Sequence, residues 1–207
     1  MGELVLVRHG QTEWSRSGQH TSYTDIDLTP DGERQALDLA AALAGRIFTA
    51  VFSSPRRRAL RTAQIAGIAV TEVTGDLAEW EYGRYEGITT PQIHRTDPAW
   101  NLWTDGAPGG ETPGRISERI DRLLDRVTPL LDHGDVALFG HGHSLRVVGA
   151  RWIGQPVEGG GRLRLDTATL SVLGHEHGRR VILHWNVPTR SSAGGSRTAS
   201  TAPPSSA

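Results

Sequence analysis

The chain has 207 residues, no cysteine and a formal net charge of −1 at pH 7. The absence of cysteine excludes disulfides, thiol nucleophiles and zinc–thiolate sites. The near balance of charges argues against nucleic acid or an acidic membrane as a partner. Because the first apolar run, Leu4 to Val7, is too short for a signal peptide or a membrane span, we expect a cytoplasmic globular protein.

Apolar patterns predict two strands and two helices in the first third of the chain. The continuous apolar run at residues 4–7 predicts a strand buried on both faces. Thr29-Pro30 predicts the start of a helix, because proline is tolerated in the first helical turn. Residues 50–52 predict a second strand and residues 57–66 a second helix. The buried stripe of the first helix, spaced by three and four residues, is predicted to be Ala36, Ala40, Leu43 and Ile47.

The rest of the chain predicts a long helix, a strand, a short helix and a hairpin. Residues 113–131 are strongly amphipathic at the helical period, which predicts a helix. An apolar strand at residues 136–139 and a helix at residues 144–152 follow. The last predicted elements are the two hairpin strands, residues 169–174 and 181–185.

Strands that alternate with helices predict an α/β fold of three layers, with a mostly parallel central sheet flanked by helices. We expect one domain over residues 1–187. Residues 188–207 contain almost no large apolar side chain, so burial cannot offset their ordering entropy. We expect them to form a disordered tail.

Polar, reactive residues directly follow three of the predicted strands. Arg8-His9-Gly10 follows the first, residues 53–58 follow the second, and Gly140-His141-Gly142-His143 follows the third. Ligands of open α/β sheets bind beyond the carboxyl ends of the strands, so these clusters are predicted to share one crevice. Arginine pairs with phosphate oxygens and a neutral imidazole can attack phosphorus. The sequence therefore predicts phosphoryl-group chemistry, with an acid from the segment 77–83.

Five blocks of the sequence resemble the histidine phosphatase, or phosphoglycerate-mutase-like, superfamily. The first block, residues 6–14, is similar to the signature of that superfamily. The other four, in the family's order, are Arg58-Ala59-x-x-Thr62-Ala63, Glu79-x-x-Tyr82-Gly83-x-x-Glu86-Gly87, Gly109-Gly110-Glu111-Thr112 and Gly140-His141-Gly142. The resemblance implies a phosphoglycerate-mutase-like fold that hydrolyses phosphate monoesters without a metal ion or another cofactor.

The resemblance also implies roles for individual residues. His9 would accept the phosphoryl group, and Glu79 would be the general acid, since it lies four residues before Gly83. The rest of the phosphoryl pocket would be formed by Arg8, Arg58 and His141. Further contacts to the substrate phosphate would come from Ser15, Thr21 and the backbone of Gly142.

A narrower similarity links the chain to fungal sedoheptulose bisphosphatases and related bacterial acid phosphatases. It implies that His143 and Arg146 contact a sugar or its distal phosphate. The insert of residues 88–106 holds only Arg95 as a fixed cation, whereas the family's mutases carry extra basic residues there. We therefore expect hydrolysis of a small phosphorylated substrate, most simply a sugar phosphate, through a phosphohistidine.

Several alternatives stay open at this point. His141 and His143 have the spacing of a metal-binding pair, and Glu81 or Glu86 could replace Glu79 as the acid. The protein could also be a phosphoglycerate-type mutase or a catalytically silent phosphate-binding module. A homodimer is left open. The tryptophans that could either line the pocket or pack in the core are Trp80, Trp100 and Trp103.

Overall fold

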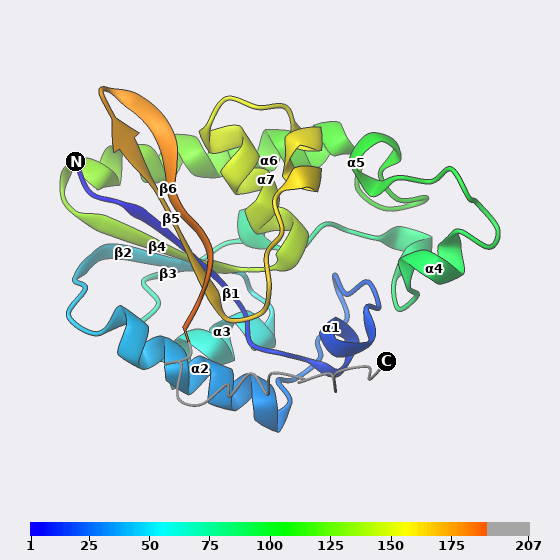
Figure 1. Ribbon diagram of the computed structural model, residues 1–207, viewed down its shortest axis with the longest axis horizontal. Coiled ribbons are helices and arrows are strands. Elements are labelled where there is room, and N and C mark those ends of the chain that lie inside the picture. Colours follow the sequence, from blue (N-terminus) through cyan, green and yellow to red (C-terminus); the bar gives the residue numbers. More distant parts are fainter. Residues whose placement is uncertain (190–207) are drawn as a thin grey trace, which may run out of the picture.

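A six-stranded sheet runs through the centre of the molecule (Figure 1), and the computed structural model describes residues 1–189. The strand order is β3-β2-β4-β1-β5-β6. The parallel strands are β1 (Leu4–Arg8), β2 (Phe48–Ser53), β3 (Glu72–Val73) and β4 (Asp135–Gly140). Two antiparallel strands, β5 (Thr169–Glu176) and β6 (Arg179–Pro188), complete the sheet as the predicted hairpin. The predicted α/β fold with a mostly parallel sheet is confirmed.

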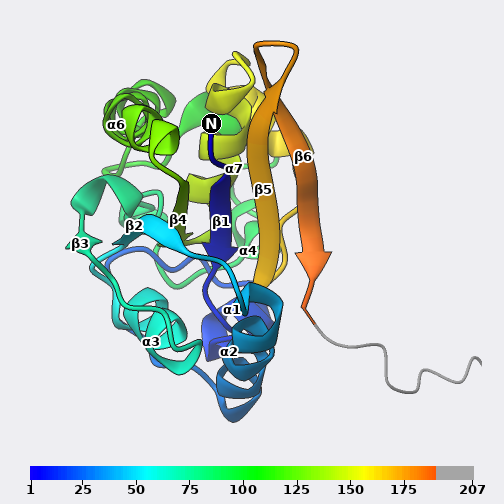
Figure 2. The ribbon, with the colours of Figure 1, turned by 90° about the vertical axis from the view of Figure 1, so that its left-hand side faces the viewer.

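Helices cover both faces of this sheet, as Figure 2 shows. One layer contains α2 (Pro30–Leu43) and α3 (Arg57–Ile65), and the other contains α6 (Pro113–Val127) and α7 (Gly142–Trp152). Successive strand residues point to opposite faces. In β1, Leu4 and Leu6 join the core under α6 and α7, whereas Val5 and Val7 join the core under α2 and α3. This double burial explains why the strand reads as one continuous apolar run.

Two helix ends differ from the sequence predictions. The helix α2 ends at Leu43, and Gly45 has a φ of 82°, so Ile47 lies outside the helix and is 88% exposed. The prediction that Ile47 belongs to the buried stripe is wrong. Ala40, also predicted to be buried, is half-buried, and Leu39 completes the stripe with Ala36 and Leu43. The helix α6 is also shorter than predicted, because Pro129 has no N–H to continue the α-helical ladder; the chain goes on as the 3₁₀ helix η3 (Thr128–Asp132).

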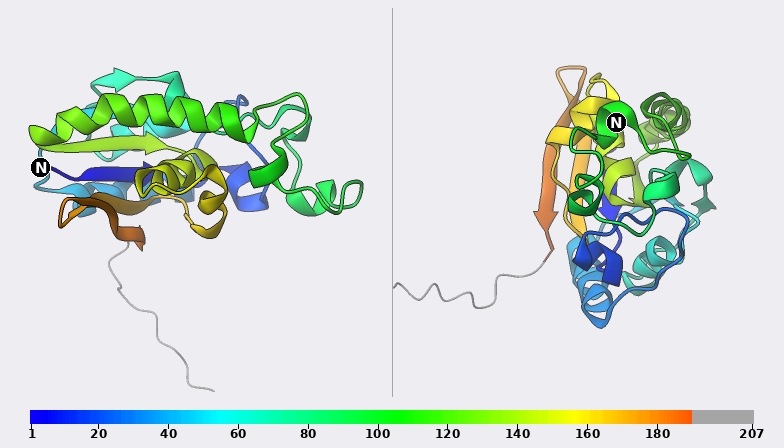
Figure 3. Two further views of the ribbon diagram at one scale, coloured as in Figure 1. Left: turned by 90° about the horizontal axis from the view of Figure 1, so that it is seen from above. Right: turned by 90° about the vertical axis from the view of Figure 1, so that its right-hand side faces the viewer.

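Three short helices that the sequence analysis did not anticipate, α1 (Glu13–Ser17), α4 (Thr90–Ile93) and α5 (Leu102–Asp105), lie beyond the carboxyl end of β1 (Figures 1 and 3). Three further 3₁₀ helices are η1 (Gly75–Leu77), which packs on α6, η2 (Gly83–Tyr85), and η4 (Val157–Arg162), which packs on α7. Of the predicted tail 188–207, residues 190–207 lie outside the described residues. Within residues 1–189, no helix is both long and apolar enough to cross a membrane.

Candidate active site

One pocket lies where β1 and β4 end. Arg8 pairs with Gly140 and Ser53 pairs with Phe139 across the sheet, so the three reactive clusters leave neighbouring strands at the same edge. All but two of the predicted site residues line this pocket, namely Arg8, His9, Ser15, Thr21, Glu79, Gly142, His143 and Arg146. Arg58 and His141 are the exceptions, because both side chains are fully buried.

His9 is oriented by the residue that follows it. Its Nδ1 lies 2.7 Å from the carbonyl oxygen of Gly10, and because a carbonyl only accepts, Nδ1 carries the hydrogen. Burial, reinforced by the charges of Arg58 and Arg8, lowers the pKa of His9 well below 6.5. The imidazole is therefore neutral at pH 7, and its Nε2 carries a lone pair that can act as a nucleophile.

The Gly10 backbone that orients His9 is itself held in place. Its N–H donates to Thr62 Oγ1 at 3.0 Å, and the Thr62 hydroxyl donates to the carbonyl of Arg58. A Cβ atom at Gly10 would lie 2.3 Å from the carbonyl oxygen of Gly32, which explains why glycine follows the histidine. The sequence analysis saw Thr62 only as part of a motif, and no local pattern indicates that it reaches Gly10.

Arg58 and His141 form a layer directly behind His9. Arg58 Nε donates to His141 Nδ1 at 3.1 Å, while its terminal nitrogens donate to backbone carbonyls of residues 21, 22 and 24. His141 Nδ1 must accept, so Nε2 carries the hydrogen and donates to Ser54 Oγ at 2.7 Å. The rings of His9 and His141 pack edge to face with 5.2 Å between their centroids. In this arrangement Arg58 supports the loop that carries Thr21 and contributes its charge from behind the pocket.

Arg8 presents an unpartnered donor at the pocket. Its Nη1 donates to the carbonyl of Leu165, whereas its Nε is buried and has no hydrogen-bond partner within residues 1–189. Gly142 packs against the guanidinium, since a Cβ there would lie 3.3 Å from Arg8 Cζ. Buried donors in proteins are nearly always satisfied, so this Nε is what a bound anion would be expected to satisfy.

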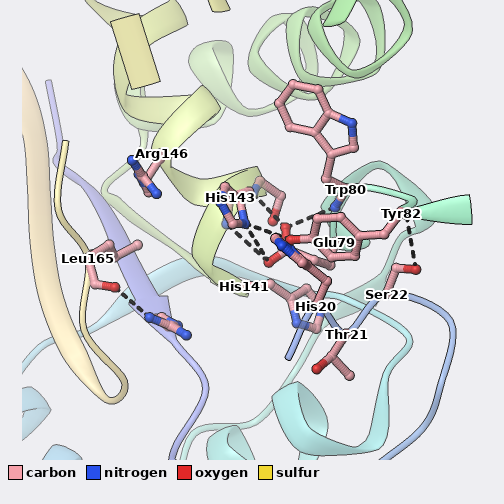
Figure 4. Close-up of polar contacts among 12 residues, drawn as sticks. His20, Thr21, Ser22, Glu79, Trp80, Tyr82, His141, His143, Arg146 and Leu165 are labelled. Atoms are coloured by element: carbon pink, nitrogen blue, oxygen red, sulfur yellow. Dashed lines mark hydrogen bonds and ion pairs between the residues drawn. The ribbon is translucent and has the colours of Figure 1, made fainter. Parts of the chain in front are cut away.

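Glu79 is anchored to the first turn of α7 (Figure 4). Its Oε1 accepts from the backbone N–H groups of Trp80 and Ser144 at 2.9 and 2.8 Å, and its Oε2 accepts from that of His143 at 3.0 Å. The carboxyl lines the pocket, and its Oε2 accepts one hydrogen bond whereas its Oε1 accepts two. Glu86, one of the alternative acids, is occupied instead by Ser22 and Thr24.

His143 carries its hydrogen on the other ring nitrogen from His9. Burial raises the pKa of Tyr82 well above 10, so its hydroxyl keeps its proton and donates to His143 Nδ1 at 2.6 Å. Burial, with a smaller contribution from Arg146, lowers the pKa of His143 well below 6.5. The neutral ring therefore carries its hydrogen on Nε2, which is a donor rather than a lone pair.

Arg146 and Trp103 lie beside His143. Arg146 donates to the carbonyls of Gly160 and Gly161 at 2.9 and 3.0 Å, and its guanidinium lies 4.5 Å from the ring of Trp103. Trp103 also packs against His143. Trp80 belongs to the core and does not line the pocket, and Trp100 is likewise buried in that core.

Two further side chains of the pocket are Ser15, which the sequence analysis predicted, and His20, which it did not. Ser15 lines the pocket, but its hydroxyl accepts from the N–H of Thr12 and donates to the carbonyl of Thr12, so here it caps α1. His20 also lines the pocket, and burial lowers its pKa to about 4. Sequence reasoning missed His20 because it lies in an irregular loop without any motif.

The geometry does not fit the alternative of a metal-binding histidine pair. His141 uses both ring nitrogens on Arg58 and Ser54, and His143 uses Nδ1 on Tyr82. Among residues 1–189, no group of three or more His, Asp or Glu side chains could hold a metal ion.

Comparisons of the sequence and the structure with known proteins identify the family of this chain. A sequence profile described as "Histidine phosphatase superfamily (branch 1)" matches residues 4–188. The chain belongs to the histidine phosphatase superfamily. It is 44% identical over 180 residues to an acid phosphatase of Mycobacterium tuberculosis, covering 86% of this chain and 88% of the relative.

Two further relatives of this histidine phosphatase superfamily member bear on its fold and activity. A sedoheptulose 1,7-bisphosphatase of Saccharomyces cerevisiae is 39% identical over 186 residues, covering 74% of this chain and 68% of the relative. A solved structure of a Mycobacterium tuberculosis open reading frame superposes with a TM-score of 0.89 at 40% identity, covering 91% of this chain and 99% of its own. The chain has the phosphoglycerate-mutase-like fold, and its relatives support a phosphatase activity on small phosphorylated molecules.

Proposed function

We propose that this protein hydrolyses small phosphate monoesters through a phosphohistidine formed at His9, without a metal ion. The observation that carries the proposal is the hydrogen bond from His9 Nδ1 to the carbonyl of Gly10. Because Nδ1 carries the hydrogen of the neutral ring, the lone pair that would attack phosphorus is on Nε2. The buried, unpartnered Nε of Arg8 lines the same pocket and supplies a cationic donor for the phosphoryl oxygens.

The proposed reaction has two steps. First, His9 Nε2 bonds to phosphorus while the bond from phosphorus to the leaving oxygen breaks, and Glu79 transfers its proton to that oxygen. Second, the Glu79 carboxylate takes a proton from a water molecule whose oxygen attacks phosphorus. The nitrogen–phosphorus bond then breaks, which releases inorganic phosphate and restores neutral His9. In such transfers the protein mainly positions groups and balances charge.

The proposed substrate is the phosphate ester of a small sugar. Within the same pocket, His143 offers an Nε2 hydrogen and Arg146 offers a guanidinium, which suit a hydroxyl and a second phosphate. A relative named sedoheptulose 1,7-bisphosphatase supports this choice.

The test is release of inorganic phosphate, in the presence of EDTA, from sugar bisphosphates, phosphoglycerates, nucleotides, a phosphotyrosine peptide and an aryl phosphate. Wild-type protein should turn over at least one of them, with a sugar bisphosphate preferred, and form an acid-labile, base-stable phosphoenzyme. His9→Ala should abolish both turnover and phosphoenzyme, because the attacking atom is lost.

His133→Ala is the matched control, because His133 is an exposed histidine at the end of η3. It should leave turnover unchanged. Wild-type turnover in the His9→Ala protein, or an activity that EDTA removes, would refute the mechanism. Exchange of phosphate between positions with little release would indicate a mutase instead.

A further inference from the structure

A buried ion pair lies behind Glu79, outside the pocket that holds His9. Arg119 of α6 and Glu111, in the loop before α6, are 9% and 7% exposed. The guanidinium meets the carboxylate with two parallel hydrogen bonds, Nε to Oε1 at 2.7 Å and Nη2 to Oε2 at 2.9 Å. Glu111 belongs to the Gly109-Gly110-Glu111-Thr112 block, for which the proposed reaction provides no role. Both side chains and Glu79 line a second depression that does not include His9.

The pair holds the backbone on both sides of Glu79. Arg119 donates to the carbonyl of Asp76 at 2.7 Å and to that of Glu79 itself at 3.3 Å. On the C-terminal side of Glu79, the backbone of Glu111 makes hydrogen bonds to the two residues that follow Glu79. Its N–H donates to the carbonyl of Glu81 at 2.8 Å, and its carbonyl accepts from Trp80 Nε1 at 2.9 Å.

The glycines of the block allow this close approach. A Cβ at Gly110 would lie 2.2 Å from the carbonyl oxygen of Glu81, and one at Gly83 would lie 2.4 Å from the backbone nitrogen of Gly110. Gly83 also has a φ of 50°, which disfavours other residues. The segment 109–111 therefore packs backbone to backbone against the segment 81–83, two residues from the carboxyl of Glu79.

Stability alone is a weak reason for such a pair. Removing two charges from water costs about as much as their attraction returns, so a buried ion pair often stabilises no better than apolar side chains of the same size. A two-bond arginine–carboxylate contact does, however, fix direction as well as distance. The carboxyl of Glu79 accepts from two N–H groups of α7 and from the N–H of Trp80. The pair fixes the backbone from which the Glu79 side chain reaches α7, because Arg119 holds the carbonyl of Glu79 and Glu111 holds Trp80.

We propose that Glu111 and Arg119 are positioning residues that hold the Glu79 carboxyl at the distance from which it protonates the leaving oxygen. This inference rests on the proposed role of Glu79 as the general acid. Neither Glu111 nor Arg119 lines the pocket that contains His9, so they act through Glu79 and not on the substrate.

The experiment compares two leaving groups in Glu111→Gln, Arg119→Lys and Glu79→Gln. From a sugar phosphate the sugar leaves as an alkoxide that needs a proton, whereas from p-nitrophenyl phosphate the p-nitrophenol leaves as a stable phenolate that does not. The quantity compared is kcat/KM, which reports the first step alone, because the later attack of water on the phosphohistidine is common to both substrates. Glu79→Gln should lower kcat/KM for the sugar phosphate by roughly 10²- to 10⁴-fold. Glu111→Gln and Arg119→Lys should lower it by about 10- to 100-fold, the cost of a misplaced catalytic group, with kcat/KM for p-nitrophenyl phosphate nearly unchanged.

Asp121→Asn is the matched control. Asp121 also lies in α6 and makes a two-bond pair with an arginine, Arg151, at 2.8 and 2.9 Å, but this pair does not hold the Glu79 segment. Asp121→Asn should leave kcat/KM unchanged for both substrates. In the double variant Glu79→Gln/Glu111→Gln, the loss should equal that of Glu79→Gln alone, because residues that act through one group are not additive.

Three results would overturn the positioning role. They are an equal loss on both substrates, no loss on the sugar phosphate, or a double variant whose losses multiply. If Glu79→Gln itself treats the two leaving groups alike, then the general acid of the proposed function is wrong and the positioning role falls with it. If Glu79→Gln slows the sugar phosphate more than p-nitrophenyl phosphate but Glu111→Gln and Arg119→Lys do not, only the positioning role is refuted.

Discussion

Three histidines of the site show how single hydrogen-bond partners set the chemistry of one residue type. The carbonyl of Gly10 places the hydrogen of His9 on Nδ1, whereas Arg58 and Tyr82 place those of His141 and His143 on Nε2. All three rings are neutral at pH 7, because burial lowers each pKa well below 6.5. One ring can therefore attack while another donates a hydrogen bond.

The Tyr82 hydroxyl provides a test at this scale. Tyr82→Phe removes the donor to His143 Nδ1, so the ring can carry its hydrogen on either nitrogen. We expect kcat/KM for a sugar bisphosphate to fall about tenfold, the cost of one such hydrogen bond, mainly through KM. Turnover of p-nitrophenyl phosphate, which lacks the sugar, should stay near the wild-type value.

Tyr85→Phe is the control, because Tyr85 packs its ring against Trp100 and does not line the pocket. It should behave like the wild type on both substrates. If Tyr82→Phe changed both substrates equally, the hydroxyl would act on the general structure and not on recognition of the sugar.

At the scale of elements, the first turn of α2 supports the loop that carries His9. Thr29 caps the helix by accepting from the N–H of Gly32 at 3.0 Å, and its own N–H donates to the carbonyl of Gln11 at 2.9 Å. Gly32 leaves no room for a side chain, because a Cβ there would lie 2.1 Å from the oxygen of Gln11. The start of this helix was predicted from Thr29-Pro30, but its contact with the loop was not.

Two glycine-to-alanine changes test that contact. Gly32→Ala should lower the free energy of unfolding by about 1–3 kcal/mol, the usual cost of overpacking, and should lower kcat by moving Gly10 and His9. Gly114→Ala, in the first turn of α6, meets only the Thr112 hydroxyl at 4.0 Å. It should raise the free energy of unfolding by up to about 1 kcal/mol, since alanine favours helices, and leave kcat unchanged. Chemical denaturation measures the free energy of unfolding, and steady-state assays measure kcat. If the two variants changed both quantities alike, the contact of Gly32 with the loop would not support His9.

At the scale of the whole molecule, four histidines with lowered pKa values, three of them buried and His143 half-buried, couple the stability of the fold to pH. Burial lowers the pKa of His20 to about 4, and the pKa values of His9, His141 and His143 lie well below 6.5. Between pH 6.5 and these folded-state pKa values, the unfolded chain binds protons that the folded protein does not. Stability is therefore full above pH 6.5 and is lost as the pH falls, by up to about 1.4 kcal/mol per pH unit for each histidine.

Thermal melting between pH 7.5 and 5 measures this coupling. We expect the melting temperature to fall steadily below pH 6.5, and His20→Gln to reduce the slope because one titrating ring is lost. His133→Gln should keep the wild-type slope, because His133 is exposed. A melting temperature that does not change down to pH 5 would contradict the coupling. Since His9 stays neutral in this range, turnover should persist until the protein unfolds.

The sequence by itself determined the class of fold, the order of its main elements and the edge of the sheet at which the chemistry collects. Each of these depends on patterns within a few residues: apolar runs of strand length, helical spacing, and reactive residues that follow a strand directly. The same locality explains the error at Ile47, because spacing alone cannot tell where a helix stops and the chain turns outward.

Only the tertiary structure decided how the site residues are used. Sequence reasoning brought Arg58 and His141 together with His9, and the fold shows that both side chains are fully buried, hold each other and hold the loop of Thr21. The pairs that set the histidine hydrogens and anchor Glu79 join residues far apart in the chain, such as Tyr82 with His143. Such contacts depend on how the layers pack against the sheet, because packing places distant side chains together, and no local pattern of residues encodes that distance.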